Sequence, residues 1–209
     1  MTEVRFAPAR RIVAAAVAAA AAALMSACAT GPQAPLSTTA VAPYASQLAL
    51  QGTLAVNYIR DGKRESLSGK FDWRQNGSRT DVELASPLGQ TIATIAVTPG
   101  EAVLKEGSNP PRSAPDVDAL STQILGWPLP VSGLRDWLQG YAVAAGGKRF
   151  AASPAANKVV THDGWELEFA TWQEGATPPA PRRIIARRGP GGDIEEIEIR
   201  IAVLPKAPQ

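Results

Sequence analysis

From residue 48 onward, apolar and polar residues alternate with a period of two, which is the pattern of strands with one buried and one solvated face. Strands are predicted at 48–58, 66–75, 82–84, 90–97, 102–105, 164–169, 181–188 and 197–203. Turn dipeptides stand between several of them, at Asp61-Gly62, Asn76-Gly77 and Pro99-Gly100. Consecutive strands joined by short turns predict an antiparallel meander.

Two short helices are predicted between these strands, at 115–126 and 134–140, because each segment has apolar residues on one face and ends at a glycine. The stripes consist of Val117, Leu120 and Ile124 in the first helix and of Leu134, Trp137 and Leu138 in the second. Neither helix is long enough to persist alone, so each is expected to dock on the sheet. The predicted fold class is therefore mainly antiparallel β with a helical insert covering a concave sheet face.

The amino terminus has the three regions of a bacterial secretory signal. Arg5, Arg10 and Arg11 precede an apolar, alanine-rich run at 12–25, and small residues follow that run. A helix over that run reaches only about 21 Å, which is too short for a hydrocarbon core of about 30 Å. We therefore expect residues 1–27 to be a signal peptide rather than a membrane-spanning helix.

The expected cleavage point precedes Cys28, and Leu24-Met25-Ser26-Ala27-Cys28 resembles a bacterial lipobox, although Met25 stands where Leu is commoner. In a lipobox the cysteine becomes the lipid-modified first residue, and several acyl chains on one residue provide stable anchoring. Cys28 is therefore the predicted lipid-attachment site. The alternative is a signal peptide cut before an unmodified cysteine. Ala29, in the position where Asp implies inner-membrane retention, implies the outer membrane.

The segment that follows lacks charge and apolar periodicity and is rich in Gly, Pro, Ala, Ser and Thr. Such a composition does not bury enough surface to fold. We expect residues 28–47 to be a lipidated flexible tether, 48–205 to be the folded domain and 206–209 to be a tail.

Charge and composition weaken two large classes of function. The chain has 209 residues and a net charge of +2, and without 1–27 it has 18 basic and 18 acidic residues, so the basic footprint of a nucleic-acid-binding protein is missing. A single cysteine and a single histidine leave little for a zinc site or for nucleophilic catalysis. His162-Asp163 near Glu166 could form an acid–base pair, but a solvated strand face explains these residues better. We expect no enzyme activity, no cofactor and no metal.

Four stretches together resemble the LolB family of outer-membrane lipoprotein receptors. They are Gly69-Lys70-Phe71-Asp72-Trp73, the run from Leu84 to Gln90, the insert from Ile124 to Gly140, and Gly164-Trp165. The resemblance covers about residues 48–204. It implies an incomplete, half-open β-barrel with a short-helix lid around a hydrophobic cavity.

The resemblance also implies a function without energy input, in which acyl chains of cargo lipoproteins pass from the periplasmic carrier LolA to this protein and then into outer-membrane lipid. The implied partners are LolA, cargo lipoproteins and outer-membrane lipid, and we expect a monomer on the periplasmic face of that membrane. The alternative is an outer-membrane-anchored lipoprotein that binds another apolar ligand or acts as an envelope scaffold.

Large apolar residues on the predicted strands and helices are candidates for the cavity lining. They are Phe71, Trp73, Leu84, Ile124, Leu134, Trp137, Leu138, Trp165 and Phe169. The same residues could fill an ordinary core, and periodicity does not separate the two interpretations.

Leu88 is the candidate residue for membrane contact. Ser86-Pro87-Leu88-Gly89 suits a type I turn, which places Leu88 at the tip. The resemblance implies a leucine in this loop that delivers lipoproteins to the membrane, although a single leucine can also fold back onto the sheet. A further basic cluster at 182–188 is expected to attract anionic head groups or an acidic partner, or else to be the charged face of an edge strand.

Overall fold

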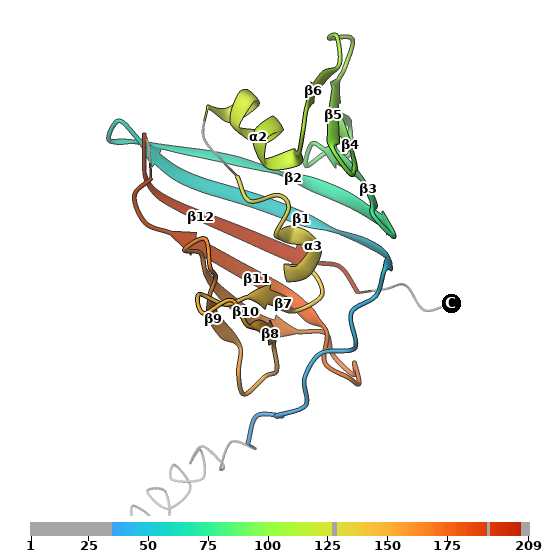
Figure 1. The fold of residues 1–209 in the computed structure, drawn as a ribbon, viewed down its shortest axis with the longest axis vertical. Helices are drawn as coiled ribbons and strands as arrows, with labels where there is room; N and C mark the ends of the chain where they lie inside the picture. Colours follow the sequence, from blue (N-terminus) through green and yellow to red (C-terminus); the bar gives the residue numbers. More distant parts are fainter. Residues whose placement is uncertain (1–34, 127–128, 192, 206–209) are drawn as a thin grey trace, which may run out of the picture. The chain divides into compact units, whose positions relative to one another are not determined.

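The computed structural model describes residues 35–126, 129–191 and 193–205, and its main element is one antiparallel sheet of ten strands (Figure 1). The strands are β1 (Gln47–Arg60), β2 (Lys63–Asn76), β3 (Arg79–Ala85), β4 (Thr91–Thr98), β5 (Glu101–Glu106), β6 (Arg112–Ala114), β9 (Lys158–Val160), β10 (Glu166–Trp172), β11 (Pro181–Arg188) and β12 (Ile194–Val203). Their order is β6-β5-β4-β3-β2-β1-β12-β11-β10-β9, and β7 (Tyr141–Val143) pairs with β8 (Arg149–Ala151) in a separate ribbon. In the described residues the edge strands β6 and β9 do not pair with each other, so the barrel is half-open, as predicted.

The long strands follow the alternation of apolar and polar residues in the sequence, and several turns lie at the predicted dipeptides. The hairpin between β1 and β2 turns at Asp61 and Gly62, which both have positive φ, at 50° and 68°. The strands β6, β7, β8 and β9 were not predicted. Each has three residues, which is too short to display a period of two.

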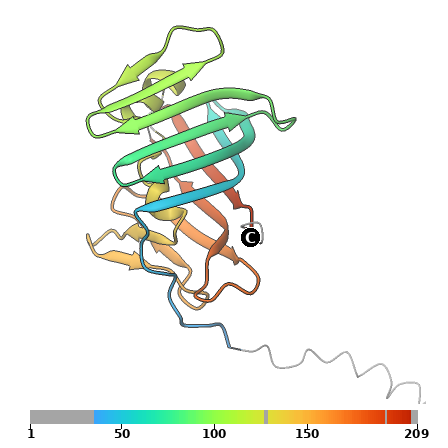
Figure 2. The same ribbon diagram turned by 90° about the vertical axis from the view of Figure 1, so that its right-hand side faces the viewer.

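Both predicted helices are present on one side of the sheet (Figures 1 and 2). Helix α2 (Val117–Leu125) begins after Asp116, whose carboxylate accepts a hydrogen bond of 2.7 Å from the Ala119 N–H. It ends at Gly126, with φ 77°. Helix α3 (Leu134–Trp137) is a single turn. Asp116 is thus the capping residue of α2, which begins two residues later than the predicted start at 115.

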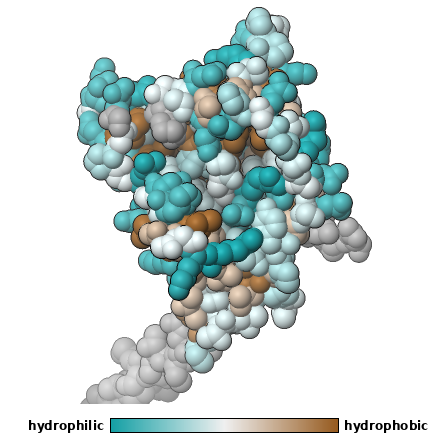
Figure 3. Space-filling model, in the orientation of Figure 1, coloured by the Kyte–Doolittle hydropathy of each residue, from teal (hydrophilic) through white to brown (hydrophobic). Residues whose placement is uncertain are grey.

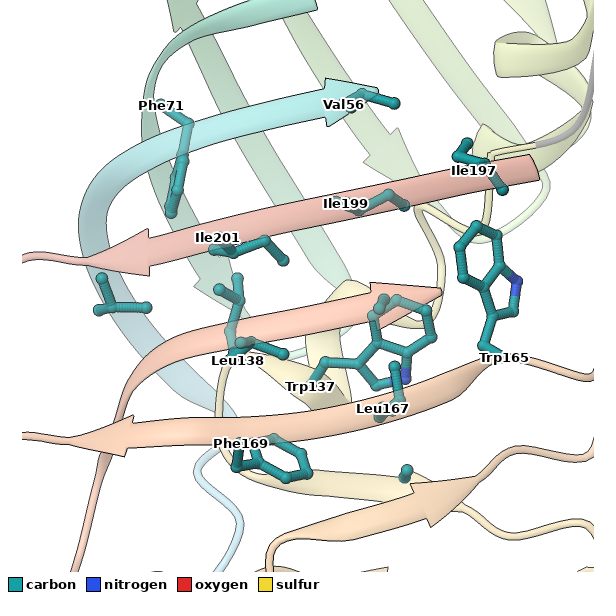
Figure 4. Close-up of a cluster of buried hydrophobic side chains, with 14 of the residues drawn as sticks. Val56, Phe71, Trp137, Leu138, Trp165, Leu167, Phe169, Ile197, Ile199 and Ile201 are labelled. Atoms are coloured by element: carbon teal, nitrogen blue, oxygen red, sulfur yellow. The ribbon is translucent and has the colours of Figure 1, made fainter. Parts of the chain in front are cut away.

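A large apolar cluster fills the space between α3 and strands β10, β11 and β12 (Figure 4). The Trp137 ring on α3 lies 5.9 Å from the Trp165 ring, measured between centroids. Phe71 fits over β1 because its partner there is Gly52. A Cβ on Gly52 would lie 2.6 Å from the Phe71 ring, so only glycine allows this packing.

The expected tether ends earlier than predicted, because the segment from Ser37 to Gln47 already packs on the folded domain. Val41 is buried, and its N–H donates a hydrogen bond of 2.9 Å to the Ala152 carbonyl. The Ala155 N–H donates to the Ser37 carbonyl at 3.0 Å. Composition could not reveal this, since the segment is held by backbone groups far away in the sequence. The expected signal peptide, Cys28, the start of the tether and the tail 206–209 lie outside the described residues.

Among the helices of the described residues, none combines the length and the apolar composition needed to cross a bilayer.

Candidate functional site

An apolar pocket of about 350 Å³ lies between helix α2 and the inner face of strands β1 to β5. Apolar surface is visible between α2 and the strands beneath it in the space-filling view (Figure 3). The strand residues of the lining include Leu54, Val56, Leu67, Leu84, Ile92, Ala93, Ile95 and Leu104, and the insert contributes Val117, Leu120, Ile124, Leu125, Leu129 and Val131. The volume lies at the lower end of the range of about 300–1,000 Å³ that is common for ligand pockets.

Polar groups are few in this pocket, and the charged ones lie at its rim. Lys70 is exposed, and Glu106 is ion-paired with Arg112. The Ser121 hydroxyl is buried and saturated, because it donates to the Asp118 carbonyl and accepts from the Leu129 N–H at 3.1 Å. Among the described residues of its lining, none has a buried side-chain polar atom without a hydrogen-bond partner, which suits a ligand that is mainly hydrocarbon.

Three contacts hold α2 in place over the pocket. The Arg60 guanidinium donates a hydrogen bond of 2.7 Å to the Leu125 carbonyl, at the helix end where a cation is favoured. At the other end of the helix, the Asp118 carboxylate accepts from the Ser132 N–H at 2.9 Å and from its hydroxyl at 2.5 Å. The Arg60 contact joins α2 to strand β1, and the two Ser132 contacts join it to the loop that follows it.

The structure places only part of the predicted cavity lining in this pocket. Leu84 and Ile124 line it. Leu134 is half-buried against the large apolar cluster. The other six residues are buried members of that cluster: Phe71, Trp73, Trp137, Leu138, Trp165 and Phe169. The structure thus places these six residues in the core and outside the lining of the pocket under α2.

The residues that sequence reasoning missed are mostly small or aliphatic. Ala93 on β4, Leu104 on β5 and Val117 on α2 are buried around the pocket. Their own signal was weak, since small and aliphatic residues are common in any strand or helix. The alternating apolar residues Ala93, Ile95 and Val97 were available in the sequence, but nothing local shows that a helix covers these strands.

Leu88 stands at the tip of the loop between β3 and β4 and is 98% exposed. The Gly89 N–H donates a hydrogen bond of 2.8 Å to the Ser86 carbonyl, which closes the expected four-residue turn. The Ser86 N–H donates to the Gln90 carbonyl at 2.8 Å and fixes the base of the loop. The projection of Leu88 into solvent is therefore built into a rigid turn.

This loop adjoins the pocket. Ala85 and Ile92, on the strands that flank it, both line the pocket, and Ile92 is half-exposed at its rim. Opposite the loop, the backbone of Gly69 on β2 approaches the Ala85 carbonyl closely, since a Cβ on Gly69 would lie 2.6 Å from that oxygen. Leu88 thus lies in a loop whose two flanking strands both contribute to the pocket lining.

The candidate acid–base group is not assembled. His162 is exposed, and its Nδ1 lies 3.9 Å from the Asp163 carboxylate, while Glu166 points outward on β10. No cluster of three metal-binding side chains occurs in the described ranges.

Elsewhere, the hydrogen bond from the Tyr58 hydroxyl to Glu65 raises the pKa of Tyr58 above its ordinary value. Tyr58 therefore stays neutral at physiological pH.

The fold and the site together define a class of protein: an open antiparallel barrel with an apolar pocket under a short helix and an exposed leucine in an adjoining loop. Comparison with known proteins specifies the family. The model of the family described as outer membrane lipoprotein LolB matches residues 46–204. The chain belongs to this family of outer-membrane lipoproteins.

Individual relatives agree with the family assignment. The chain is 35% identical over 192 residues to the outer-membrane lipoprotein LolB of Cupriavidus taiwanensis, covering 88% of this chain and 92% of the relative. It is 39% identical over 170 residues to that of Cupriavidus metallidurans, covering 78% and 81%. Among solved structures, a LolA superfamily protein from Nitrosomonas europaea matches with a TM-score of 0.42 and 7% identity over 75% of this chain and 84% of the other.

Proposed function

We propose that the domain receives the acyl chains of lipoproteins from the periplasmic carrier LolA in the pocket under α2 and releases them into the outer membrane without energy input. The single observation that carries the proposal is the apolar pocket of about 350 Å³ that adjoins the loop of Leu88. It supplies a place for hydrocarbon and an exposed apolar contact on the same side of one domain.

The physical need for such a pocket comes from the cargo. Each methylene group gains about 0.8 kcal/mol when it leaves water, so uncovered acyl chains are held back from an aqueous compartment. Transfer between two apolar pockets and then into lipid keeps the chains covered at every stage. The differences in affinity between successive sites determine the direction of transfer, and no catalytic group is required.

The size of the pocket indicates how it is used. At about 350 Å³ it is small for several acyl chains at once. Cargo entry therefore requires α2 to move away from the sheet, which breaks the hydrogen bond of Arg60 to the Leu125 carbonyl. Closure restores that bond, so α2 acts as a lid.

Cys28 is proposed to carry the lipid that anchors the mature protein to the outer membrane. It lies outside the described residues, and the proposal rests on the lipobox-like sequence before it. In this proposal the anchor holds the domain near the membrane and takes no part in transfer.

Both proposals can be tested with a mature chain that carries Cys28→Ser behind an ordinary cleavable signal, which yields protein without an acyl anchor. Purified LolA loaded with a triacylated lipoprotein is mixed with this chain, and the cargo on each protein is quantified after separation. We expect the cargo to move to the unacylated chain and then into added membrane vesicles. A folded chain that takes no cargo from the carrier would contradict the receptor role, and binding of an unrelated apolar ligand alone would favour the other class of lipoprotein.

A further inference from the structure

A second hollow, which we call the basic groove, lies on the outer face of the sheet and has a volume of about 340 Å³. Its cations are Lys70, Arg183 and Arg200, and one wall is Pro87 of the loop that carries Leu88. The proposed transfer of acyl chains makes no use of this groove.

Strand register explains how the groove is built. Lys70 on β2 pairs with Thr53, Thr53 pairs with Ala202, and Ala202 pairs with Arg183 on β11, so these four residues form one row across four strands. Three strand spacings separate the ends of the row by roughly 14 Å. The two residues between them are small, so the row forms a shallow floor with a cation at each end. Arg200 lies in the next row and reaches the same floor.

The charges of the groove are mostly uncompensated. Within the described ranges, no carboxylate lies within ion-pair distance of Lys70 or Arg183, and the lining contains no acidic residue. Arg200 pairs with Glu198 at 2.6 Å. Two free cations therefore flank a floor of small side chains.

The remaining arginines of the 182–188 cluster are engaged elsewhere. Arg187 pairs with Glu198 at 2.7 Å and lies 3.8 Å from Glu168. Arg182 lies 3.9 Å from Glu174, and the Arg188 guanidinium lies over the Trp165 ring. The structure thus singles out Arg183 from a cluster that the sequence presents as uniform.

The groove and the apolar pocket meet at one edge. Ser68, Gly69 and Lys70 line both of them, one from each side of β2. Leu88 follows Pro87 directly and projects fully into solvent. A lipid surface that touches Leu88 is therefore also within reach of the cations of the groove and of the pocket rim.

We propose that the basic groove binds the phosphate groups of membrane phospholipids and turns the domain so that Leu88 and the pocket rim face the bilayer. The orientation rests on the proposed membrane contact of Leu88, whereas the binding of phosphate rests on Lys70, Arg183 and Arg200. Continuity with an exposed leucine favours a lipid surface over an acidic protein, which would gain nothing from that leucine. Cations close to an anionic membrane each strengthen binding roughly fivefold.

Vesicle flotation tests the groove directly. The unacylated mature chain with Cys28→Ser is mixed with vesicles of phosphatidylethanolamine and phosphatidylglycerol at low salt. Arg183→Gln is expected to weaken binding roughly fivefold, and a double variant with Lys70→Gln more than tenfold. Arg182→Gln, the same change on the adjacent exposed residue outside the groove, should stay within about twofold. Equal losses for Arg182→Gln and Arg183→Gln, or no loss in the double variant, would overturn the proposal.

Two further arms identify the ligand. Inorganic phosphate should not release the protein from vesicles more than chloride of equal ionic strength does; selective release would make the groove a site for free phosphate. The single variant Arg183→Gln, which lies outside the lining of the pocket under α2, should still take cargo from LolA, and a loss of that step with intact vesicle binding would assign the groove to the carrier instead. Vesicle binding needs no cargo, so a failure of the receptor function in the unaltered chain is seen separately in the transfer assay.

Discussion

Helices α3 and α2 cover two regions of the same sheet, but what lies beneath them differs. Under α3 the side chains are large: Trp137, Trp165 and Phe169 belong to one continuous buried cluster (Figure 4). Under α2 the smaller buried cluster includes three alanines, Ala93, Ala102 and Ala114. A helix cannot approach a sheet closer than its own backbone and side chains allow, so small residues on facing strands leave a pocket where large ones fill the space.

The difference shows that side-chain volume, and not the presence of a helical cover, decides where the apolar pocket lies. The large side chains under α3 stabilise the fold, and the small ones under α2 leave the pocket open.

Truncation in the filled region should have the largest effect. Trp137→Ala removes a buried ring that packs on Trp165 and is expected to lower the free energy of unfolding by about 3–5 kcal/mol. Ile124→Ala is the matched change on the other helix, and it should cost about 1 kcal/mol because that side chain is half-exposed and already borders the pocket. Urea denaturation measures both. Similar losses at the two positions would remove the distinction between the regions.

Enlarging an alanine should lower stability more in the filled region and ligand affinity more in the pocket. Ala186→Phe on β11 inserts a ring into a fully buried position and should cost about 1–3 kcal/mol through overpacking. Ala93→Phe on β4 places the same ring in the pocket, so stability should change by less than about 1 kcal/mol. Affinity for a fluorescent fatty acid, measured by titration, should fall at least tenfold in Ala93→Phe. Unaltered affinity in a folded Ala93→Phe protein would show that the pocket does not hold hydrocarbon.

The attachment of α2 can be weakened without touching the pocket lining. Arg60→Met removes the hydrogen bond to the Leu125 carbonyl and should lower stability by about 1 kcal/mol, since the guanidinium is only partly buried. A helix that opens more often should exchange a bound fluorescent fatty acid several-fold faster in stopped-flow displacement. Arg64→Met, an exposed residue of the same hairpin, is the control and should leave the exchange rate unchanged. Equal rates for the two variants would argue against α2 as the lid.

Features that depend on local sequence were predictable. Alternation gave the long strands, and Asp61-Gly62 gave a turn whose two residues have the expected positive φ. Leu88 was predicted at a turn tip because Ser86, Pro87 and Gly89 specify that turn within four residues. Each of these inferences needs information from only a few neighbouring positions.

Features that depend on distant partners were not predictable in the same way. Trp137 and Ile124 both lie on apolar helix stripes, yet one fills the core and the other borders the pocket. The distinction depends on which strands each helix meets and on the size of residues such as Ala93 there. Likewise, Val41 belongs to the domain only because it meets Ala152, more than a hundred residues later.

Leu88→Glu is expected to have the smallest effect on stability but a large effect on function. Its side chain is 98% exposed, so Leu88→Glu removes no buried contact and the type I turn accepts the new residue. The free energy of unfolding should therefore change by less than about 0.5 kcal/mol. The carboxylate, however, resists entry into lipid, so we expect cargo to be accepted from LolA but not passed on to membrane vesicles.

Leu88→Ile is the matched control, because it keeps an apolar side chain of equal size at the turn tip and should deliver cargo normally. Both steps are measured on one purified sample, first the transfer from the carrier and then the incorporation into vesicles. If Leu88→Glu lost acceptance as well, the loop would belong to the pocket entrance rather than to the membrane contact. If it delivered normally, the leucine would have no role in lipid, and the basic groove would remain as the proposed contact between the folded domain and the bilayer.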